Sequence, residues 1–75
     1  MKTLLESSIK NEYRILNIKE NLSSVVIKRL KELGIITGNR VILLYKNKIS
    51  KSGIVRIFSS LISLDYKILS NIEVE

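Results

Sequence analysis

Apolar and polar residues alternate over several short stretches of the chain, which is the spacing of β-strands rather than of helices. The stretch from Tyr13 to Ile18 shows this alternation in part and ends in a polar break, and the last residues, from Asn71 to Glu75, show it throughout. Between them lies a nearly continuous apolar run from Arg40 to Lys46. This run predicts the strongest strand of the protein, buried on both faces over part of its length.

Two more strands are expected in the second half of the chain. Residues 53–59 and 61–65 predict a hairpin with a tight turn at Ser59 and Ser60, and Tyr66 to Ser70 predicts one helical turn. Strands in so small a protein would expose sheet edges, and closure into a barrel removes such edges. The pattern therefore predicts a mainly β fold, a small β-barrel of about five strands with one inserted α-helix.

The inserted helix is expected near residues 23–33. Val26, Leu30 and Leu33 recur at intervals of three and four residues, so they would form one apolar face packed on the barrel. A serine at position 23 or 24 can cap the start of the helix, and Gly34 supplies the left-handed residue that ends it. Gly38 then turns the chain into the long apolar strand.

The composition removes most catalytic chemistry. The 75 residues include no cysteine, histidine, tryptophan or proline, so the usual zinc ligands and the histidine that activates a serine nucleophile are missing. Seven acidic residues scattered among 13 basic ones make a poor iron site. We therefore expect a single domain over residues 1–75 that is not an enzyme, carries no cofactor and binds no metal by itself.

No segment predicts a membrane span or a secretory signal. The longest uninterrupted apolar run, from Val41 to Tyr45, is far shorter than the roughly 20 residues that a spanning helix needs. The residues after Met1 include Glu6 and lack the apolar core of about 7–15 residues that a signal peptide has. The expected location is the cytoplasm.

Positive charge is concentrated in one part of the sequence. The stretch from Lys28 to Lys51 contains a single acidic residue, Glu32, and carries the whole net charge of +6. Clustered charge attracts an acidic partner over long range, although such a run can also be only a solvated face. The candidate partner-binding residues are Lys28, Arg29, Lys31, Arg40, Lys46 and Lys48.

The stretch from Arg29 to Val41 reads RLKELGIITGNRV and resembles the signature R-L-x-E-L-G-[I/L/M]-x-x-G-x-x-[I/V] of the FeoA family. The resemblance covers nearly the whole chain, since Ile15 and Ile18 match the first strand and the ending Ile72-Glu73-Val74 matches the family's I-x-V. It implies an SH3-like barrel and a single FeoA-like domain. The motif positions that would mainly specify the fold are Leu30, Leu33, Gly34 and Gly38.

Two departures from the family pattern fall near the end of the chain. Asp65 stands where the family usually has arginine, and Leu69 stands where it usually has alanine. The same barrel forms the C-terminal domain of iron-dependent repressors of the DtxR type. Because no helix-turn-helix precedes it here, a free-standing transport accessory is favoured over a repressor.

The resemblance implies a small cytosolic accessory protein of ferrous-iron uptake, which binds the cytosolic GTPase region of the transporter FeoB and modulates it. A basic SH3-like nucleic-acid-binding module is the alternative, because clustered cations also fit a phosphate track. Only Tyr45 lies within the basic stretch as an aromatic platform for bases. If the basic face is only solvated, an apolar patch around Ile35, Ile36 and Tyr45 is the next candidate surface.

Overall fold

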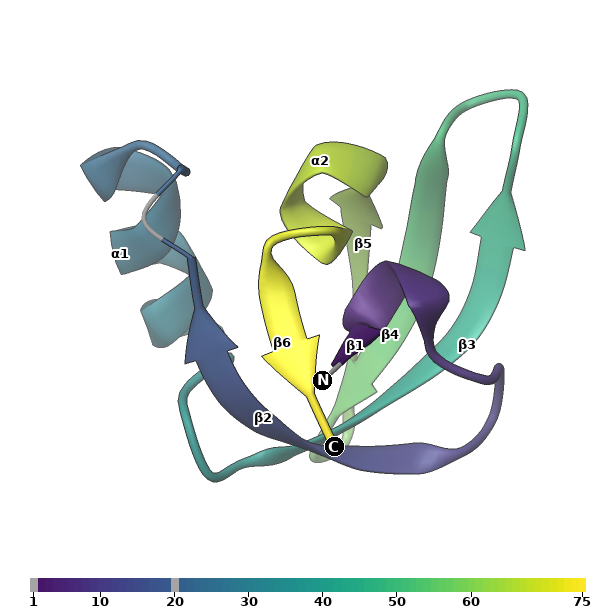
Figure 1. Ribbon diagram of the computed structural model, residues 1–75, viewed down its shortest axis with the longest axis horizontal. Coiled ribbons are helices and arrows are strands. Elements are labelled where there is room, and N and C mark those ends of the chain that lie inside the picture. The colour runs from purple at the N-terminus through teal and green to yellow at the C-terminus, as the bar shows by residue number, and fades with distance from the viewer. Residues whose placement is uncertain (1, 20) are drawn as a thin grey trace.

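One antiparallel sheet of six strands, in the order β1-β6-β2-β3-β4-β5, dominates the computed structural model, which describes residues 2–19 and 21–75 (Figure 1). The strands are β1 (Lys2–Thr3), β2 (Glu12–Ile18), β3 (Arg40–Asn47), β4 (Ser52–Ile57), β5 (Ser60–Asp65) and β6 (Ile72–Val74). A 3₁₀ turn η1 (Leu4–Glu6), the helix α1 (Ser24–Glu32) and the short helix α2 (Tyr66–Leu69) connect them. The mainly β prediction is therefore confirmed, with its inserted helix and its late helical turn.

The predicted closure into a barrel is wrong, because the sheet stays open. Its two outermost strands, β1 and β5, each pair with a single neighbour. The short elements between these strands replace the missing ladder: α2 contacts both β5 and η1, and η1 contacts β6. Strand β1 and the turn η1 were not among the predicted elements. Side-chain packing thus closes the core where barrel hydrogen bonds were expected.

The sheet curves strongly, as β2 and β3 show across the lower part of Figure 1. The curvature has a local cause, since the pairing register shifts in β2 between Ile15 and Asn17 and in β3 between Leu43 and Tyr45. An irregularity of this kind bends a strand and increases its twist. The bend lets one small sheet wrap around its own core.

Burial along β3 differs from the prediction of two buried faces. Val41 and Leu43 are fully buried, whereas Ile42 and Leu44 on the opposite face are only half-buried. One face of the strand therefore enters the core, and the other is only partly covered. The sequence shows that residues of β3 are apolar. How far each face of the strand is buried depends on which other elements pack against it.

The hairpin between β4 and β5 turns one residue earlier than predicted. Ile57 pairs with Ser60, so the two residues of the loop are Phe58 and Ser59. Phe58 has φ of 55°, a left-handed conformation that such loops usually give to glycine or asparagine. The strain is of the order of 1–3 kcal/mol. The loop places the aromatic ring of Phe58 at the hairpin tip.

The core gathers the inward residues of the sheet with a few from the helices. Its buried members are Leu4, Ile15, Leu22, Leu30, Ile35, Val41, Leu43, Val55, Ile57, Leu64, Leu69, Ile72 and Val74. From α1, Leu30 is only 2% exposed and Val26 packs against the core in part. Leu33 is half-buried. The predicted packing face of the helix is therefore confirmed for Val26 and Leu30, and Leu33 contributes less to it.

The two motif glycines both have left-handed backbone conformations, which the sequence predicted for Gly34. Gly34 has φ of +94° and Gly38 has φ of +97°, both strained for any other residue. A Cβ on Gly34 would lie 3.1 Å from the Cγ2 atom of Ile57, whereas Gly38 has open space on that side. The Gly38 amide donates to the Ile15 carbonyl oxygen (2.7 Å), which fixes the loop after α1 to β2.

Candidate interaction surface

Helix α1 presents three of the six candidate cations. Its first turn is capped by Ser23, whose Oγ accepts a hydrogen bond from the amide of Val26 (3.2 Å). Lys28, Arg29 and Lys31 are all exposed. Arg29 lies 3.8 Å from Glu32, and an exposed ion pair of this kind contributes little to stability. The helix cations, as we call Lys28, Arg29 and Lys31, are therefore free to meet a partner.

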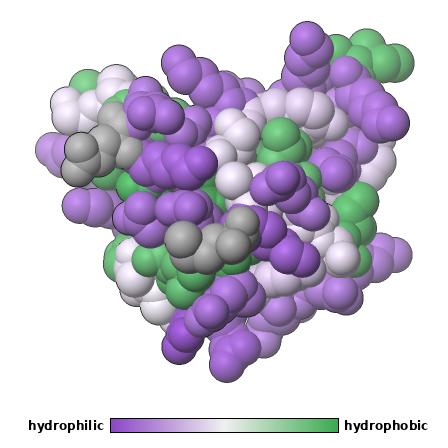
Figure 2. Space-filling view, viewed as in Figure 1, coloured by the Kyte–Doolittle hydropathy of each residue, from purple (hydrophilic) through white to green (hydrophobic). Residues whose placement is uncertain are grey.

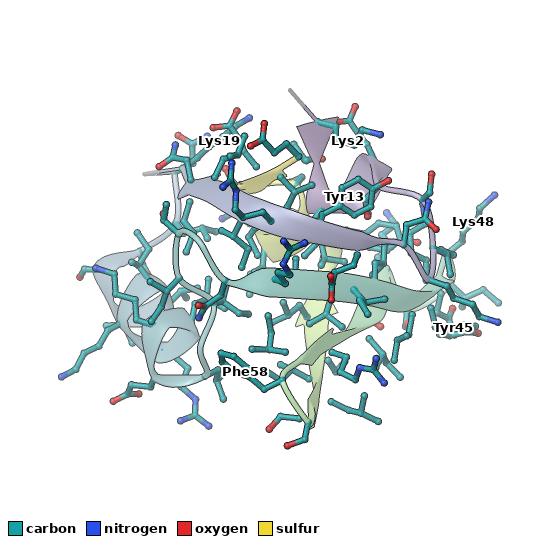
Figure 3. All side chains as sticks on the ribbon, turned by 90° about the horizontal axis from the view of Figure 1, so that it is seen from below. Lys2, Tyr13, Lys19, Tyr45, Lys48 and Phe58 are labelled. Carbon is teal, nitrogen blue, oxygen red and sulfur yellow. The ribbon has the colours of Figure 1, made fainter. Side chains whose placement is uncertain are left out.

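The cations on and after β3 have different surroundings. The Arg40 guanidinium lies 3.3 Å from the Glu12 carboxylate across the strand pair. Lys46 donates from Nζ to the carbonyl oxygen of Leu5 (3.1 Å) and thereby ties β3 to η1. Lys48 extends from the β3–β4 loop into solvent (Figure 3). Arg40 and Lys46 thus have partners within the protein.

The six cations do not form one continuous surface. Helix α1 lies at one side of the molecule and the β3–β4 hairpin at the other, in both Figure 1 and Figure 3. Strand β3 alone spans about 23 Å at the usual rise per residue. A partner at the helix cations is therefore well beyond one screening length from Lys48, since that length is about 10 Å at 0.1 M salt.

The alternative apolar patch around Ile35, Ile36 and Tyr45 is also divided. Ile35 is fully buried and Ile36 is exposed in the loop after α1, while Tyr45 lies near the hairpin end of the molecule (Figure 3). The space-filling view shows a mostly hydrophilic face whose apolar tip at the upper right lies over the β3–β4 hairpin (Figure 2), where Ile49 is 96% exposed. These residues cannot serve one partner surface together.

A largely apolar groove of about 580 Å³ runs between α1 and β5. We call it the α1–β5 groove, and it is lined by Val25, Val26, Arg29, Leu30, Leu33, Leu61, Ile62, Ser63, Leu64 and Ile68. Two of its apolar side chains are unusually exposed, Val25 at 77% and Leu61 at 65%. Sequence reasoning missed this groove, although both residues stand outside the apolar faces expected of their elements and could have been noticed there.

Two titratable groups of the N-terminal segment have shifted pKa values. Hydrogen bonds from Ser8, through its side chain and its backbone amide, lower the pKa of Tyr13 to about 8. A hydrogen bond from the backbone amide of Thr3 lowers the pKa of the Glu6 carboxyl. Both groups stabilise the N-terminal segment. Among residues 2–19 and 21–75, no three acidic side chains gather where they could hold a metal ion.

The FeoA domain family model matches residues 2–75, which is nearly the whole chain. The chain belongs to the FeoA domain family. The resemblance found in the sequence is thereby confirmed. Within this FeoA domain, the motif residues Leu30, Gly34 and Gly38 have the structural roles described above.

Solved structures share this FeoA fold at low sequence identity. The FeoA of Stenotrophomonas maltophilia complexed with zinc, described as an SH3 domain protein and a candidate ferrous iron transport activating factor, is 18% identical with a TM-score of 0.85; the match covers 100% of this chain and 91% of that one. A FeoA-like protein from Clostridium acetobutylicum is 23% identical with a TM-score of 0.80, over 99% and 84% of the two chains. The fold is therefore that of an SH3-like domain with an open sheet.

The same fold also occurs inside longer proteins. ScaR with bound Zn²⁺ is 23% identical with a TM-score of 0.83, and the match covers 100% of this chain but only 36% of ScaR. The chain likewise spans 44% of the iron(II) transport protein A of Clostridium thermocellum that it matches. No curated protein matches the sequence. In the part of the chain that the structure describes, no helix is long and apolar enough to cross a membrane.

Proposed function

We propose that this FeoA domain is a cytoplasmic accessory factor of ferrous-iron uptake, which binds the cytosolic GTPase region of the transporter FeoB and modulates it. The observation that carries the proposal is the family match over residues 2–75. Two structural neighbours support it, one described as an iron(II) transport protein and the other as a candidate transport activating factor. Iron is the transporter's cargo in this proposal, and we assign the domain no catalytic step.

The helix cations are the proposed electrostatic contact with the transporter. All three are exposed on one helix; Arg29 lines the α1–β5 groove, and Lys31 lies on the other flank of the helix, near Ile18 and Ile36. Arg40 is as exposed in its ion pair as Arg29 is, so only Lys46, which ties β3 to η1, is a weaker candidate. Charge near a docking site acts mainly on the association rate. Binding should therefore weaken with salt, as the screening length falls from about 10 Å at 0.1 M to about 3 Å at 1 M.

A pair of charge-reversal variants tests this assignment. Lys28→Glu with Lys31→Glu reverses charge on α1, and Lys48→Glu with Lys51→Glu makes the same change of net charge at the β3–β4 hairpin. All four side chains are exposed, so both variants should keep the parent's circular dichroism and melting temperature. Binding to the purified cytosolic region of FeoB would be measured by calorimetry at low and high salt, with iron uptake measured in cells that lack the domain.

We expect the helix variant to lose most of its affinity and to fail in iron uptake, while the hairpin variant stays close to the parent. Equal losses would mean that net charge matters and its position does not. A parent domain that shows no affinity for the transporter region at low salt would refute the proposed function itself.

The nucleic-acid alternative has less support from the geometry. A phosphate track needs cations in series along one surface, and here α1 and the β3–β4 hairpin lie at opposite sides (Figure 3). The exposed rings of Tyr45 and Phe58 come from different hairpins and make no shared stacking platform. A purified domain whose 260/280 absorbance ratio is high and falls after a high-salt wash would favour this alternative.

A further inference from the structure

The α1–β5 groove follows the free edge of a strand. Four consecutive residues of β5, from Leu61 to Leu64, border it. Successive side chains of a strand point to opposite faces, so a cavity lying over one face would touch only alternate residues. The groove therefore runs along the side of β5 that no other strand of the sheet occupies.

The backbone of β5 offers unpaired hydrogen-bonding groups at this edge. Ile57 and Ser60 close a two-residue loop, and the residues that flank such a loop bond to each other in both directions. Bonded pairs then alternate along the hairpin, which directs the amides of Ile62 and Leu64 toward β4. The N–H and C=O groups of Leu61 and Ser63 consequently face the groove, and no described residue outside β4 bonds to them.

We propose that the α1–β5 groove receives an extended, acidic segment of another polypeptide, which adds to the sheet as a further strand beside β5. Backbone hydrogen bonds to Leu61 and Ser63 would supply affinity, as in other cases of strand addition. Alternate apolar side chains of the segment would fill the groove between Val25, Leu33 and Leu61. Helix α1 then acts as a wall that selects side chains by size and charge.

Charge favours an acidic polypeptide over a second copy of this chain. Arg29 is the charged residue among those that line the groove, and the whole chain carries a net charge of +6. Two copies pairing edge to edge would bring like charges together, which is unfavourable. An acidic side chain on the groove-facing side of an incoming strand would instead meet Arg29, which lines the groove together with Val25 and Leu33. The groove thus discriminates by sign of charge as well as by shape.

This inference does not depend on FeoB as the partner, because it concerns only the chemistry of the segment. The probe is a random octapeptide library displayed on phage and panned against the immobilised full chain at low salt. Enriched peptides would be synthesised and added to ¹⁵N-labelled protein for amide chemical-shift and hydrogen-exchange measurements. We expect peptides whose alternate positions hold apolar residues with an acidic residue among them, shifts from Leu61 to Leu64 and along α1, and slowed exchange at Leu61 and Ser63.

Two controls separate strand addition from simple apolar binding. A peptide methylated at every second backbone nitrogen keeps its side chains but loses the donors to β5, and it should bind at least about tenfold more weakly. Val25→Glu adds an acid at an exposed groove position and should weaken binding, whereas Ile49→Glu makes the matched change at the far hairpin, where Ile49 is also exposed, and should not.

Three outcomes would overturn the proposal. The first is that no peptide is enriched, or that the enriched peptides shift residues elsewhere on the domain. The second is that methylation of the peptide backbone leaves its affinity unchanged. The third is concentration-dependent slowing of exchange at Leu61 and Ser63 without any peptide, which would assign the edge to a second copy of the chain. The transporter is absent from this test. A negative result therefore leaves the proposed function standing, and a positive result does not prove that function.

Discussion

The two edges of the sheet are built in opposite ways. At one edge, β1 has only two residues, the Thr3 amide donates to the Glu6 carboxylate (2.9 Å), and the Lys2 ammonium lies 5.3 Å from the centre of the Tyr13 ring. At the other edge, β5 has six residues, and its outward backbone groups at Leu61 and Ser63 have no such cover. The first edge is closed by its own side chains, and the second is open.

The difference shows where an additional strand can be accepted. Short length, a lysine and a local cap are the usual means by which proteins keep sheet edges from pairing with other chains, and β1 has all three. Strand β5 lacks them and instead faces the wall formed by α1. An open apolar edge is an aggregation hazard, which the high positive charge of the chain reduces by repulsion between copies. We therefore regard β5 as an edge that is kept for a partner.

Removing the attachment of α1 should have the largest effect, because the helix is one wall of the open edge. Leu30 is 2% exposed and joins the helix to the core. Leu30→Ala should lower the free energy of unfolding by about 2–5 kcal/mol, measured by urea denaturation. Val25→Ala, on the exposed side of the same helix, should change it by less than about 0.5 kcal/mol. If Leu30→Ala unfolds at the parent's urea concentration, α1 is not anchored as described.

Proline substitutions in β5 distinguish its bonded side from its open side. Ile62→Pro removes an amide that bonds to β4 and leaves a carbonyl oxygen without its donor, so it should destabilise by about 1–3 kcal/mol more than Ser63→Pro. Proline is tolerated where the missing N–H faces away from the sheet. Thermal unfolding by circular dichroism compares the two. Equal destabilisation would show that the edge at Ser63 is already paired.

Alanine substitutions at the two motif glycines distinguish the cost of backbone strain from the cost of contact with β4. Gly38→Ala places alanine at φ of +97° with no atom nearby, so strain alone should cost about 1–2 kcal/mol. Gly34→Ala adds a Cβ only 3.1 Å from the side chain of Ile57 in β4, so it should cost more. Urea unfolding of both variants gives the comparison. A smaller loss for Gly34→Ala than for Gly38→Ala would mean that the loop after α1 moves freely against β4.

The closed edge should show a pH dependence. The pKa of Tyr13 falls from 10.0 to about 8 in the folded protein because of its hydrogen bonds from Ser8. Since the folded value is the lower one, this contribution to stability is present in full above pH 10 and is lost as the pH falls through about 8. Absorbance of tyrosinate near 295 nm should show a step near pH 8 that Tyr13→Phe removes. A titration that is unchanged in that variant would contradict the assignment.

Local features of the fold were predictable from the sequence. The helix follows from the spacing of Val26 and Leu30, and its end follows from Gly34, since these signals act within a few residues. The turn of the last hairpin was misplaced by one residue because Phe58 adopts a conformation that its residue type disfavours. Only the surrounding structure imposes that conformation.

Features that join distant segments were not predictable. Whether the sheet closes depends on β1, a strand of two residues that has no detectable pattern. The candidate cations form one run in sequence, but β3 carries Lys48 away from α1 as it crosses the sheet (Figure 3). The α1–β5 groove combines Val25 with Leu61, which come from elements separated by two strands. Such contacts between distant segments depend on the topology of the fold, which the local patterns of one sequence do not determine.

Amide hydrogen exchange along β5 tests the central claim, that this edge of the FeoA domain is open and ready to pair. In the free protein, the amides of Ile62 and Leu64 should exchange slowly, and those of Leu61 and Ser63, one residue away on the same strand, should exchange as fast as loop amides. After addition of an enriched acidic peptide, Leu61 and Ser63 should become slow while β1 stays unchanged. Uniform protection of all four amides in the free monomer, or new protection at β1 in place of β5, would contradict the account.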